Sequence, residues 1–174
     1  MSADPSRAGH DPDRLLGTYL RDHLAGAATG LSLVGRCREA NRENRVGDAL
    51  GDIEAEIAED RQALIRVMER LDVSPNPLKT FAAKAAALLG RVKTNGTLTR
   101  YSPSSRVVEL EGLLAGVTAK RALWRTLLQA CASRPELDAA SLERLIAQAT
   151  SQLDRLTAEH GWATAVAFDR SSSP

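Results

Sequence analysis

Apolar residues recur at a spacing of three and four positions along four long stretches of the chain, with charged residues between them. This period places the apolar side chains on one face of a helix, so the pattern predicts four amphipathic helices, in residues 13–40, 46–71, 107–128 and 142–163. Polar residues at 41–44 and Arg134-Pro135 interrupt the pattern and predict short turns. Helices joined by short turns are expected to form two antiparallel hairpins.

The connection between the two hairpins is long. This connection spans residues 72–103. Near its start lies Ser74-Pro75-Asn76-Pro77, which is expected to end the second helix. A further apolar stripe then predicts a short fifth helix; its members are Leu78, Phe81, Ala85, Leu88 and Val92. A helix of about 17 residues is about 25 Å long, so this segment can carry the chain along most of a bundle. The sequence therefore predicts an all-α four-helix bundle with one long helical crossover.

Composition supports a helical fold and excludes several others. Aromatic residues make up 3% of the 174 residues, while alanine fills 28 positions, a balance that disfavours an all-β core. The longest apolar run is far shorter than the ~20 residues that cross a bilayer, and no secretory signal precedes the first helix. Cys37 and Cys131 lack a metal-binding spacing, which is typical of a reduced, cytoplasmic protein. We expect one domain at residues 13–168 and disordered tails at 1–12 and 169–174.

Pairs of glycines one helical turn apart occur in two of the predicted helices. Gly26 and Gly30 lie in the first helix, and Gly112 and Gly116 lie in the long helix after the crossover. A glycine inside a helix costs roughly 1 kcal/mol relative to alanine, so it usually has a packing reason. We therefore expect the backbones of these two helices to approach each other closely at the glycines.

Polar residues within the apolar stripes form the candidate site. His23, Asp60 and Arg121 fall in register with the apolar residues of their helices, and Lys120 lies beside Arg121. His23 lies about as far before the turn at residues 41–44 as Asp60 lies after it, so the two side chains are expected to face each other. The crossover is expected to bring Lys120 and Arg121 to the same level of the bundle. A buried charge is costly unless it is paired. We therefore predict that these four residues form a buried network in which a cationic side chain keeps Asp60 ionised.

Two other interpretations of these residues stay open. A rotation of one helix would place one or more of them on the surface. Alternatively, His23, Glu56 and Asp60 would form a mononuclear metal site, because carboxylates and imidazoles are common ligands of transition metals. His160 is the remaining candidate ligand, although it is expected near the opposite end of the bundle.

Four long helices, a crossover and inward-facing polar residues resemble the ferritin-like superfamily over residues 13–167. The segments Asp-His-Leu-Ala-Gly at 22–26 and Leu-Glu-x-Leu-x-x-Gly-Val at 110–117 are also similar to uncharacterised helical-bundle proteins of high-GC bacteria. The resemblance implies a ferritin-like fold for the whole bundle.

Enzymes of that superfamily carry a di-iron centre built from two Glu residues and two Glu-x-x-His motifs, so the resemblance raises the expectation of such a centre here. Here Leu20 and Thr157 stand three positions before His23 and His160. No residue of the family's motif therefore carries over to this sequence by position.

These observations lead to one expected function and two alternatives. We expect a non-enzymatic cytoplasmic bundle with a degenerate, metal-free core that acts through protein contacts, with no cofactor. The first alternative is an iron- or manganese-dependent oxidoreductase or storage protein. The second is an anion-binding module, because residues 73–108 contain no acidic residue and include several cations, among them Lys79, Lys84, Arg91 and Lys93.

Expected partners are limited by charge and composition. The formal net charge is +1, and no aromatic residues interleave with the cations of the crossover, so specific binding of nucleic acid is not expected. A homodimer is compatible with a helical bundle, and the sequence identifies no particular protein partner.

Overall fold

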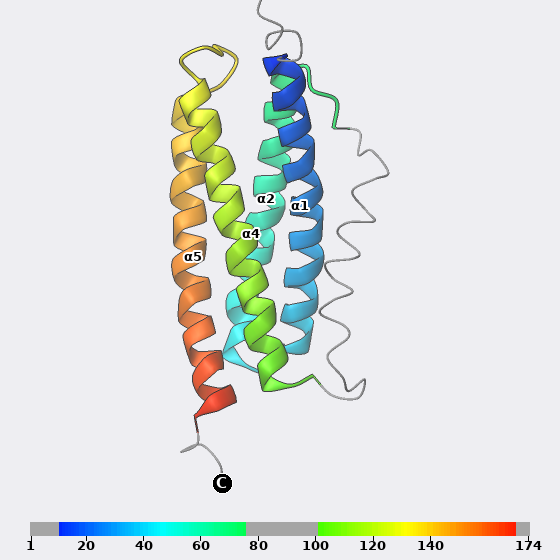
Figure 1. The fold of residues 1–174 in the computed structure, drawn as a ribbon. Coiled ribbons are helices and arrows are strands. Elements are labelled where there is room, and N and C mark those ends of the chain that lie inside the picture. Colours follow the sequence, from blue (N-terminus) through cyan, green and yellow to red (C-terminus); the bar gives the residue numbers. More distant parts are fainter. Residues whose placement is uncertain (1–10, 76–100, 170–174) are drawn as a thin grey trace, which may run out of the picture.

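The computed structural model describes residues 11–75 and 101–169, and within these ranges it contains four helices and no strand (Figure 1). The helices are α1 (Pro12–Ala40), α2 (Arg45–Arg70), α4 (Pro103–Ala130) and α5 (Ala139–Phe168). The prediction of an all-α fold with four long helices is confirmed. The predicted fifth helix and most of both predicted tails lie outside the described residues.

Each helix begins where a polar side chain caps its first turn. The carboxylate of Asp11 accepts hydrogen bonds from the backbone N–H groups of Asp13 and Arg14, and Pro12 occupies the first helical position. Asn44, Ser102 and Asp138 cap the other three helices in the same way. Such caps satisfy backbone donors that have no partner within the helix.

The turn between α1 and α2 is tight because Gly47 lies directly against it. A Cβ atom at Gly47 would lie 2.3 Å from the backbone oxygen of Asn41, closer than real Cβ atoms come to any neighbour. Asn41 is itself buried, and its side chain donates a hydrogen bond of 2.7 Å to the backbone oxygen of Cys37. Glycine at position 47 therefore allows the chain to reverse within a few residues.

The helices are arranged so that α1 and α5 run in one direction and α2 and α4 in the other (Figure 1). At one end of the bundle, Asn41 after α1 donates a hydrogen bond of 2.7 Å to the hydroxyl of Tyr101 before α4. At the other end, Arg134 between α4 and α5 pairs with Asp13 at the start of α1. The connection between α2 and α4 therefore joins opposite ends of the bundle, and Cys37 and Cys131 lie at opposite ends.

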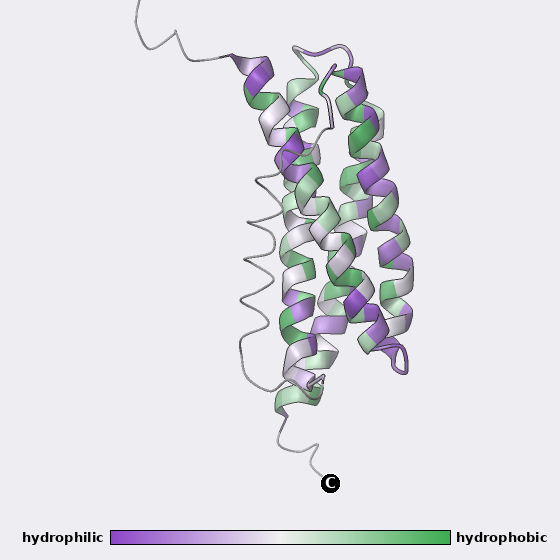
Figure 2. Cartoon of the chain, turned by 90° about the vertical axis from the view of Figure 1, so that its right-hand side faces the viewer, coloured by the Kyte–Doolittle hydropathy of each residue, from purple (hydrophilic) through white to green (hydrophobic). Residues whose placement is uncertain are grey.

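The core consists of two hydrophobic clusters stacked along the bundle. Each helix alternates between hydrophobic and hydrophilic residues, as amphipathic helices do (Figure 2). The first cluster lies toward the α1–α2 turn and includes Val34, Leu50, Ile53 and Leu110. The second lies toward the α4–α5 turn and includes Leu20, Met68, Trp124 and Leu142.

The glycine pairs do not bring two backbones together, so that prediction is wrong. A Cβ atom placed on Gly26, Gly30 or Gly116 would meet no atom within 4 Å, and one on Gly112 would meet only the end of the Leu33 side chain. The four glycines instead line a pocket between α1 and α4. Missing side chains here create space rather than a close helix contact.

Within residues 11–75 and 101–169, none of the helices has the length and apolar character that crossing a membrane requires.

Candidate functional site

A layer of polar side chains, partly buried at its ends and fully enclosed at Asp60 and Gln152, lies between the two hydrophobic clusters. Lys120 of α4 forms an ion pair with Asp60 Oδ2 of α2, and its ammonium group donates a second hydrogen bond of 2.5 Å to Gln152 Oε1 of α5. Gln152 in turn donates through Nε2 to Glu56 Oε2 at 3.0 Å and to Asp60 Oδ2 at 3.2 Å. We call these four residues, with Arg155, the polar layer.

Arg155 completes the polar layer by pairing with Glu56. Asp60 is 2% exposed and Gln152 is fully buried, whereas the side chain of Lys120 is 15% exposed. The layer holds two carboxylates and two cationic side chains, so its formal charges cancel. Pairing of this kind offsets the cost of removing the charges from water.

The electrostatics of Lys120 reflect its position inside the bundle. Burial lowers the pKa of its ammonium group, while the charges of Asp60 and Glu56 and the hydrogen bond to Asp60 act in the opposite direction. Burial therefore favours the neutral amine of Lys120, and the ion pair with Asp60 favours the charged ammonium group.

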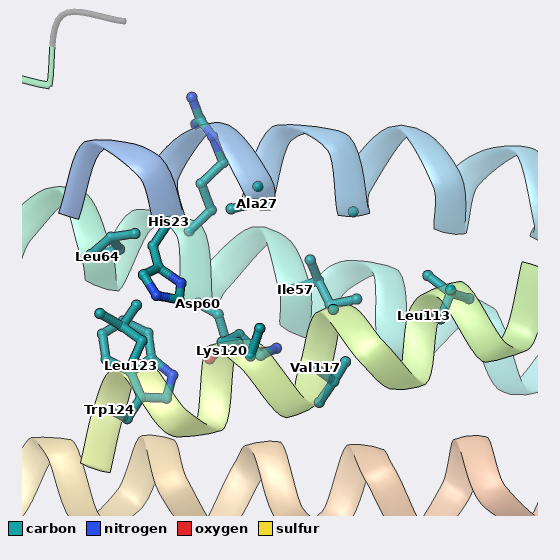
Figure 3. A pocket seen from close by; sticks show the side chains of 16 residues that line it. His23, Ala27, Ile57, Asp60, Leu64, Leu113, Val117, Lys120, Leu123 and Trp124 are labelled. Atoms are coloured by element: carbon teal, nitrogen blue, oxygen red, sulfur yellow. Dashed lines mark hydrogen bonds and ion pairs between the residues drawn. The ribbon is translucent and has the colours of Figure 1, made fainter. Parts of the chain in front are cut away.

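A pocket of about 130 Å³ lies beside the polar layer, between α1, α2 and α4. Figure 3 shows His23, Asp60, Lys120 and Trp124 grouped on one side of the pocket, with Ile57, Leu113 and Val117 on the other. Most of the surface of the pocket is apolar, and Gly26, Gly30, Gly112 and Gly116 contribute to its lining.

His23 is a half-buried wall of this pocket. Burial lowers its pKa, and the nearby charge of Asp22 opposes that shift. Its ring packs edge-on against Tyr19, with 4.6 Å between the ring centroids. A lowered pKa keeps the imidazole neutral around pH 7.

Two buried polar atoms of residues lining the pocket have no hydrogen-bond partner in the described part of the chain. They are Asp60 Oδ1, an acceptor, and Trp124 Nε1, a donor. Trp124 is only 1% exposed, so its N–H is withdrawn from bulk water. Unpaired buried polar atoms are rare because each costs roughly 1–3 kcal/mol.

The structure brings together some of the sequence-predicted site residues and separates others. Lys120 contacts Asp60, and His23 lies on the same side of the pocket, without a hydrogen bond to either residue in the described part of the chain. Arg121 is half-buried and belongs neither to the polar layer nor to the pocket lining. Lys120, not its neighbour, is therefore the cation that compensates Asp60.

Sequence reasoning missed Gln152 and Arg155. Gln152 lies three positions after the buried Ala149 and four before the buried Leu156, so helical periodicity could have placed it inside. Leu153 directly follows Gln152, and this apolar neighbour favours the adjacent face of α5 as the buried face. Arg155 carries no such signal, because a single arginine on a helix is usually exposed.

The candidate metal ligands do not converge. His160 lies 3.3 Å from Glu111, near the other end of the bundle from His23, while Glu56 and Asp60 are bound by side chains of the polar layer. Across residues 11–75 and 101–169, no three His, Cys, Asp or Glu side chains gather as a metal site would require. Among the described residues, His23, Glu56, Asp60 and His160 are therefore not assembled as one set of metal ligands. The candidate anion contacts Lys79, Lys84, Arg91 and Lys93 lie outside the described residues.

A second polar cluster closes the end of the bundle where α1 meets α2. The guanidinium groups of Arg45 and Arg106 both contact the ring of Trp162, at 5.9 Å and 5.3 Å from its centroid. Arg45 also forms two hydrogen bonds with the buried carboxylate of Glu159, which raise the pKa of the arginine. This arrangement covers the first hydrophobic cluster with a partly buried indole ring.

The thiol of Cys37 at this end is buried and unreactive in character. Burial and the charge of Glu109 raise its pKa to about 12. Its sulfur lies 3.8 Å from the hydroxyl of Tyr101, which also donates to Glu109 Oε2 at 3.0 Å. A thiol with a raised pKa is a poor nucleophile at neutral pH.

Comparison of this chain with models of protein families, with characterised proteins and with solved structures finds no match.

Proposed function

We propose that this chain is a non-enzymatic, ferritin-like helical bundle whose core is closed by its own side chains, and that it acts through contacts with another protein. The observation that carries the proposal is the position of Lys120. Its ammonium group pairs with Asp60 and bonds to Gln152 inside the bundle, whereas ferritin-like enzymes hold metal between inward-facing carboxylates. In this chain the side chain of Lys120 supplies the positive charge that a metal ion would otherwise supply next to Asp60.

Two of the described side chains that could act as a nucleophile or a base support this proposal. Burial raises the pKa of Cys37, and His23 has no hydrogen bond to a carboxylate within residues 11–75 and 101–169. General acid–base or nucleophilic catalysis needs a group activated by a positioned partner.

Protein contact is supported by apolar side chains exposed at one end of the bundle. Tyr101 and Val108 near the start of α4, and Val166 and Phe168 at the end of α5, are each at least 37% exposed. These termini lie at the same end of the molecule (Figure 1). Of the described residues, only Leu15 adds a large exposed apolar side chain at the opposite end. Apolar groups gathered in one region are typical of interaction surfaces.

The metal-free core is tested by metal uptake of the full chain and of a Lys120→Glu variant. The proposal predicts that the wild-type chain, offered iron(II), manganese(II) or zinc(II) and then freed of excess, retains well below one equivalent per chain. Lys120→Glu places a third carboxylate beside Asp60 and Glu56, so its thermal midpoint should rise when manganese(II) is added. One or two equivalents on the wild-type chain would instead favour a metal-dependent oxidoreductase or storage protein.

The contact surface is tested by the association state of the full chain. Sedimentation velocity over a range of protein concentrations measures self-association, with a second copy as the first partner to examine. Phe168→Asp should abolish any association, whereas Leu15→Asp, at an apolar side chain that is exposed at the opposite end, should not. A dimer that survives Phe168→Asp would show that another surface makes the contact.

A further inference from the structure

The pocket beside the polar layer is maintained at a cost to the fold. Gly26 and Gly30 of α1 and Gly112 and Gly116 of α4 line it, and each glycine inside a helix costs roughly 1 kcal/mol relative to alanine. At three of the four positions an added Cβ atom would meet nothing within 4 Å. Close packing therefore does not explain Gly26, Gly30 and Gly116, whereas an occupant of the pocket would.

The two unpaired polar atoms specify a chemical group for that occupant. Asp60 Oδ1 requires a hydrogen-bond donor, and Trp124 Nε1–H requires an acceptor. Both residues are at least 98% buried and line the same pocket. A hydroxyl group can donate one hydrogen bond and accept others, so it can satisfy both atoms.

The apolar part of the pocket specifies the rest of the occupant. Opposite the polar side chains, Ile57, Leu113 and Val117 form a hydrocarbon wall (Figure 3). The volume of about 130 Å³ is close to that of an engineered apolar cavity of about 150 Å³ that binds benzene. The pocket therefore has room for a single six-membered ring.

The charges around the pocket favour a neutral occupant. The charge of Asp60 is matched by Lys120, so an ionised ligand would enter a buried region that is already balanced. Arg61 also lines the pocket and is half-buried, which makes an anionic ligand the alternative to be tested.

We propose that this pocket binds a small neutral aromatic alcohol, with the ring against the apolar wall and the hydroxyl between Asp60 and Trp124. The hydroxyl donates to Asp60 Oδ1 and accepts from Trp124 Nε1–H. A phenol is the simplest molecule of this class, and a hydrogen bond from its hydroxyl to a buried carboxylate is of the charge-assisted, stronger kind.

The experiment uses fluorine NMR with three probes that share one ring and differ in one group. The probes are 4-fluorophenol, fluorobenzene and 4-fluorobenzoate, each titrated with the full wild-type chain. We expect 4-fluorophenol to bind about tenfold more tightly than fluorobenzene, because only the phenol satisfies the two unpaired atoms. We expect 4-fluorobenzoate to bind more weakly than the phenol.

Two variants locate the binding and one control matches them. Gly116→Leu fills the pocket and should abolish binding of 4-fluorophenol, while Gly161→Leu, where an added Cβ atom also meets nothing within 4 Å, should leave it unchanged. Trp124→Phe removes the N–H donor and should reduce the preference for phenol over fluorobenzene. In the wild-type chain, the indole N–H resonance of Trp124 should shift on binding, and that of Trp162 should not.

Several results would overturn the proposal. No binding of 4-fluorophenol, or equal binding of fluorobenzene, would mean that the unpaired atoms do not select a hydroxyl. Tighter binding of 4-fluorobenzoate would assign the pocket to an anion held by Arg61. Unchanged binding in Gly116→Leu would place the ligand elsewhere. None of these outcomes depends on metal uptake or self-association, so the proposal fails or holds separately from the proposed function.

Discussion

Replacing Lys120 with methionine tests whether the polar layer holds the bundle together. Methionine keeps most of the length and apolar volume of the lysine side chain but removes its ammonium group. Asp60, which is 2% exposed, would then keep only the hydrogen bond of 3.2 Å from Gln152 Nε2. The substitution therefore leaves a buried carboxylate without a cation.

The magnitude follows from the burial of the two partners. Removing one member of a buried ion pair costs roughly 3–5 kcal/mol. The side chain of Lys120 is 15% exposed and Gln152 stays in place, so we expect the lower limit, about 3 kcal/mol. That loss lowers the folding equilibrium constant by about 150-fold at 25 °C and, for an m-value of about 2 kcal/mol/M, lowers the urea midpoint by about 1.5 M.

The assay is urea unfolding followed by circular dichroism, with Arg121→Met as the matched control. Arg121 is the next residue on the same helix and is also long and cationic, but it belongs neither to the polar layer nor to the pocket lining. Its replacement should change the free energy of unfolding by less than about 0.5 kcal/mol. Equal effects of the two substitutions at pH 7 would refute the assignment of Lys120 as the compensating cation.

Three further predictions follow from single positions. Gly47→Ala should lower the free energy of unfolding by about 2 kcal/mol or more, because its Cβ atom would collide with the α1–α2 turn. Gly51→Ala, which meets open space, should raise the free energy of unfolding by about 0.5–1 kcal/mol. Urea unfolding that shows both substitutions shifting stability in the same direction would contradict this. At pH 8, a thiol reagent should modify Cys131 in the folded chain and reach Cys37 only after unfolding, because burial raises the pKa of Cys37 to about 12; two fast thiols would count against the buried position. The pKa of His23 is lowered below 6.5, so just below that pH the unfolded chain binds more protons than the folded chain. The free energy of unfolding should therefore rise as the pH increases through this window. His23→Gln should lose this pH dependence, and an unchanged pH dependence in the variant would assign it to other groups.

The arrangement of helices could be predicted from the sequence because it depends on spacing alone. Apolar periodicity gave four helices, and the described helices Pro12–Ala40 and Arg45–Arg70 begin and end close to the interruptions in the pattern. Short polar turns impose antiparallel neighbours whatever the side chains do.

The candidate site was only partly predictable because it depends on the rotation of each helix. Asp60 lies between the buried Ile57 and Leu64, so its position on the inner face of α2 is unambiguous. On α5, apolar residues occupy two adjacent faces, and a rotation of one position exchanges Leu153 for Gln152. An alanine- and leucine-rich helix therefore hides which polar residue is buried.

The glycines show a second limit of sequence reasoning. Periodicity places Gly26, Gly30, Gly112 and Gly116 on the facing sides of α1 and α4, and this is where the structure has them. The same pattern fits two helices in contact and two helices separated by a pocket. Only the distance between the helices distinguishes these cases, and that distance is set by side chains of three helices at once.

The polar layer also has a consequence for the uniqueness of the fold. The hydrophobic clusters on either side of it consist mostly of leucine, valine and isoleucine, so a slip of α4 along α2 by one turn, about 5.4 Å, would exchange mostly similar side chains. The same slip would separate Lys120 from Asp60 and bury both charges without partners, as a buried polar residue fixes register in coiled coils. Replacing both residues with apolar ones, in an Asp60→Leu/Lys120→Met variant, should therefore recover most of the stability that Lys120→Met loses but permit more than one register. In amide NMR spectra this variant should show doubled or broadened signals for α2 and α4, whereas a single sharp set of signals would mean that the hydrophobic clusters alone determine the register.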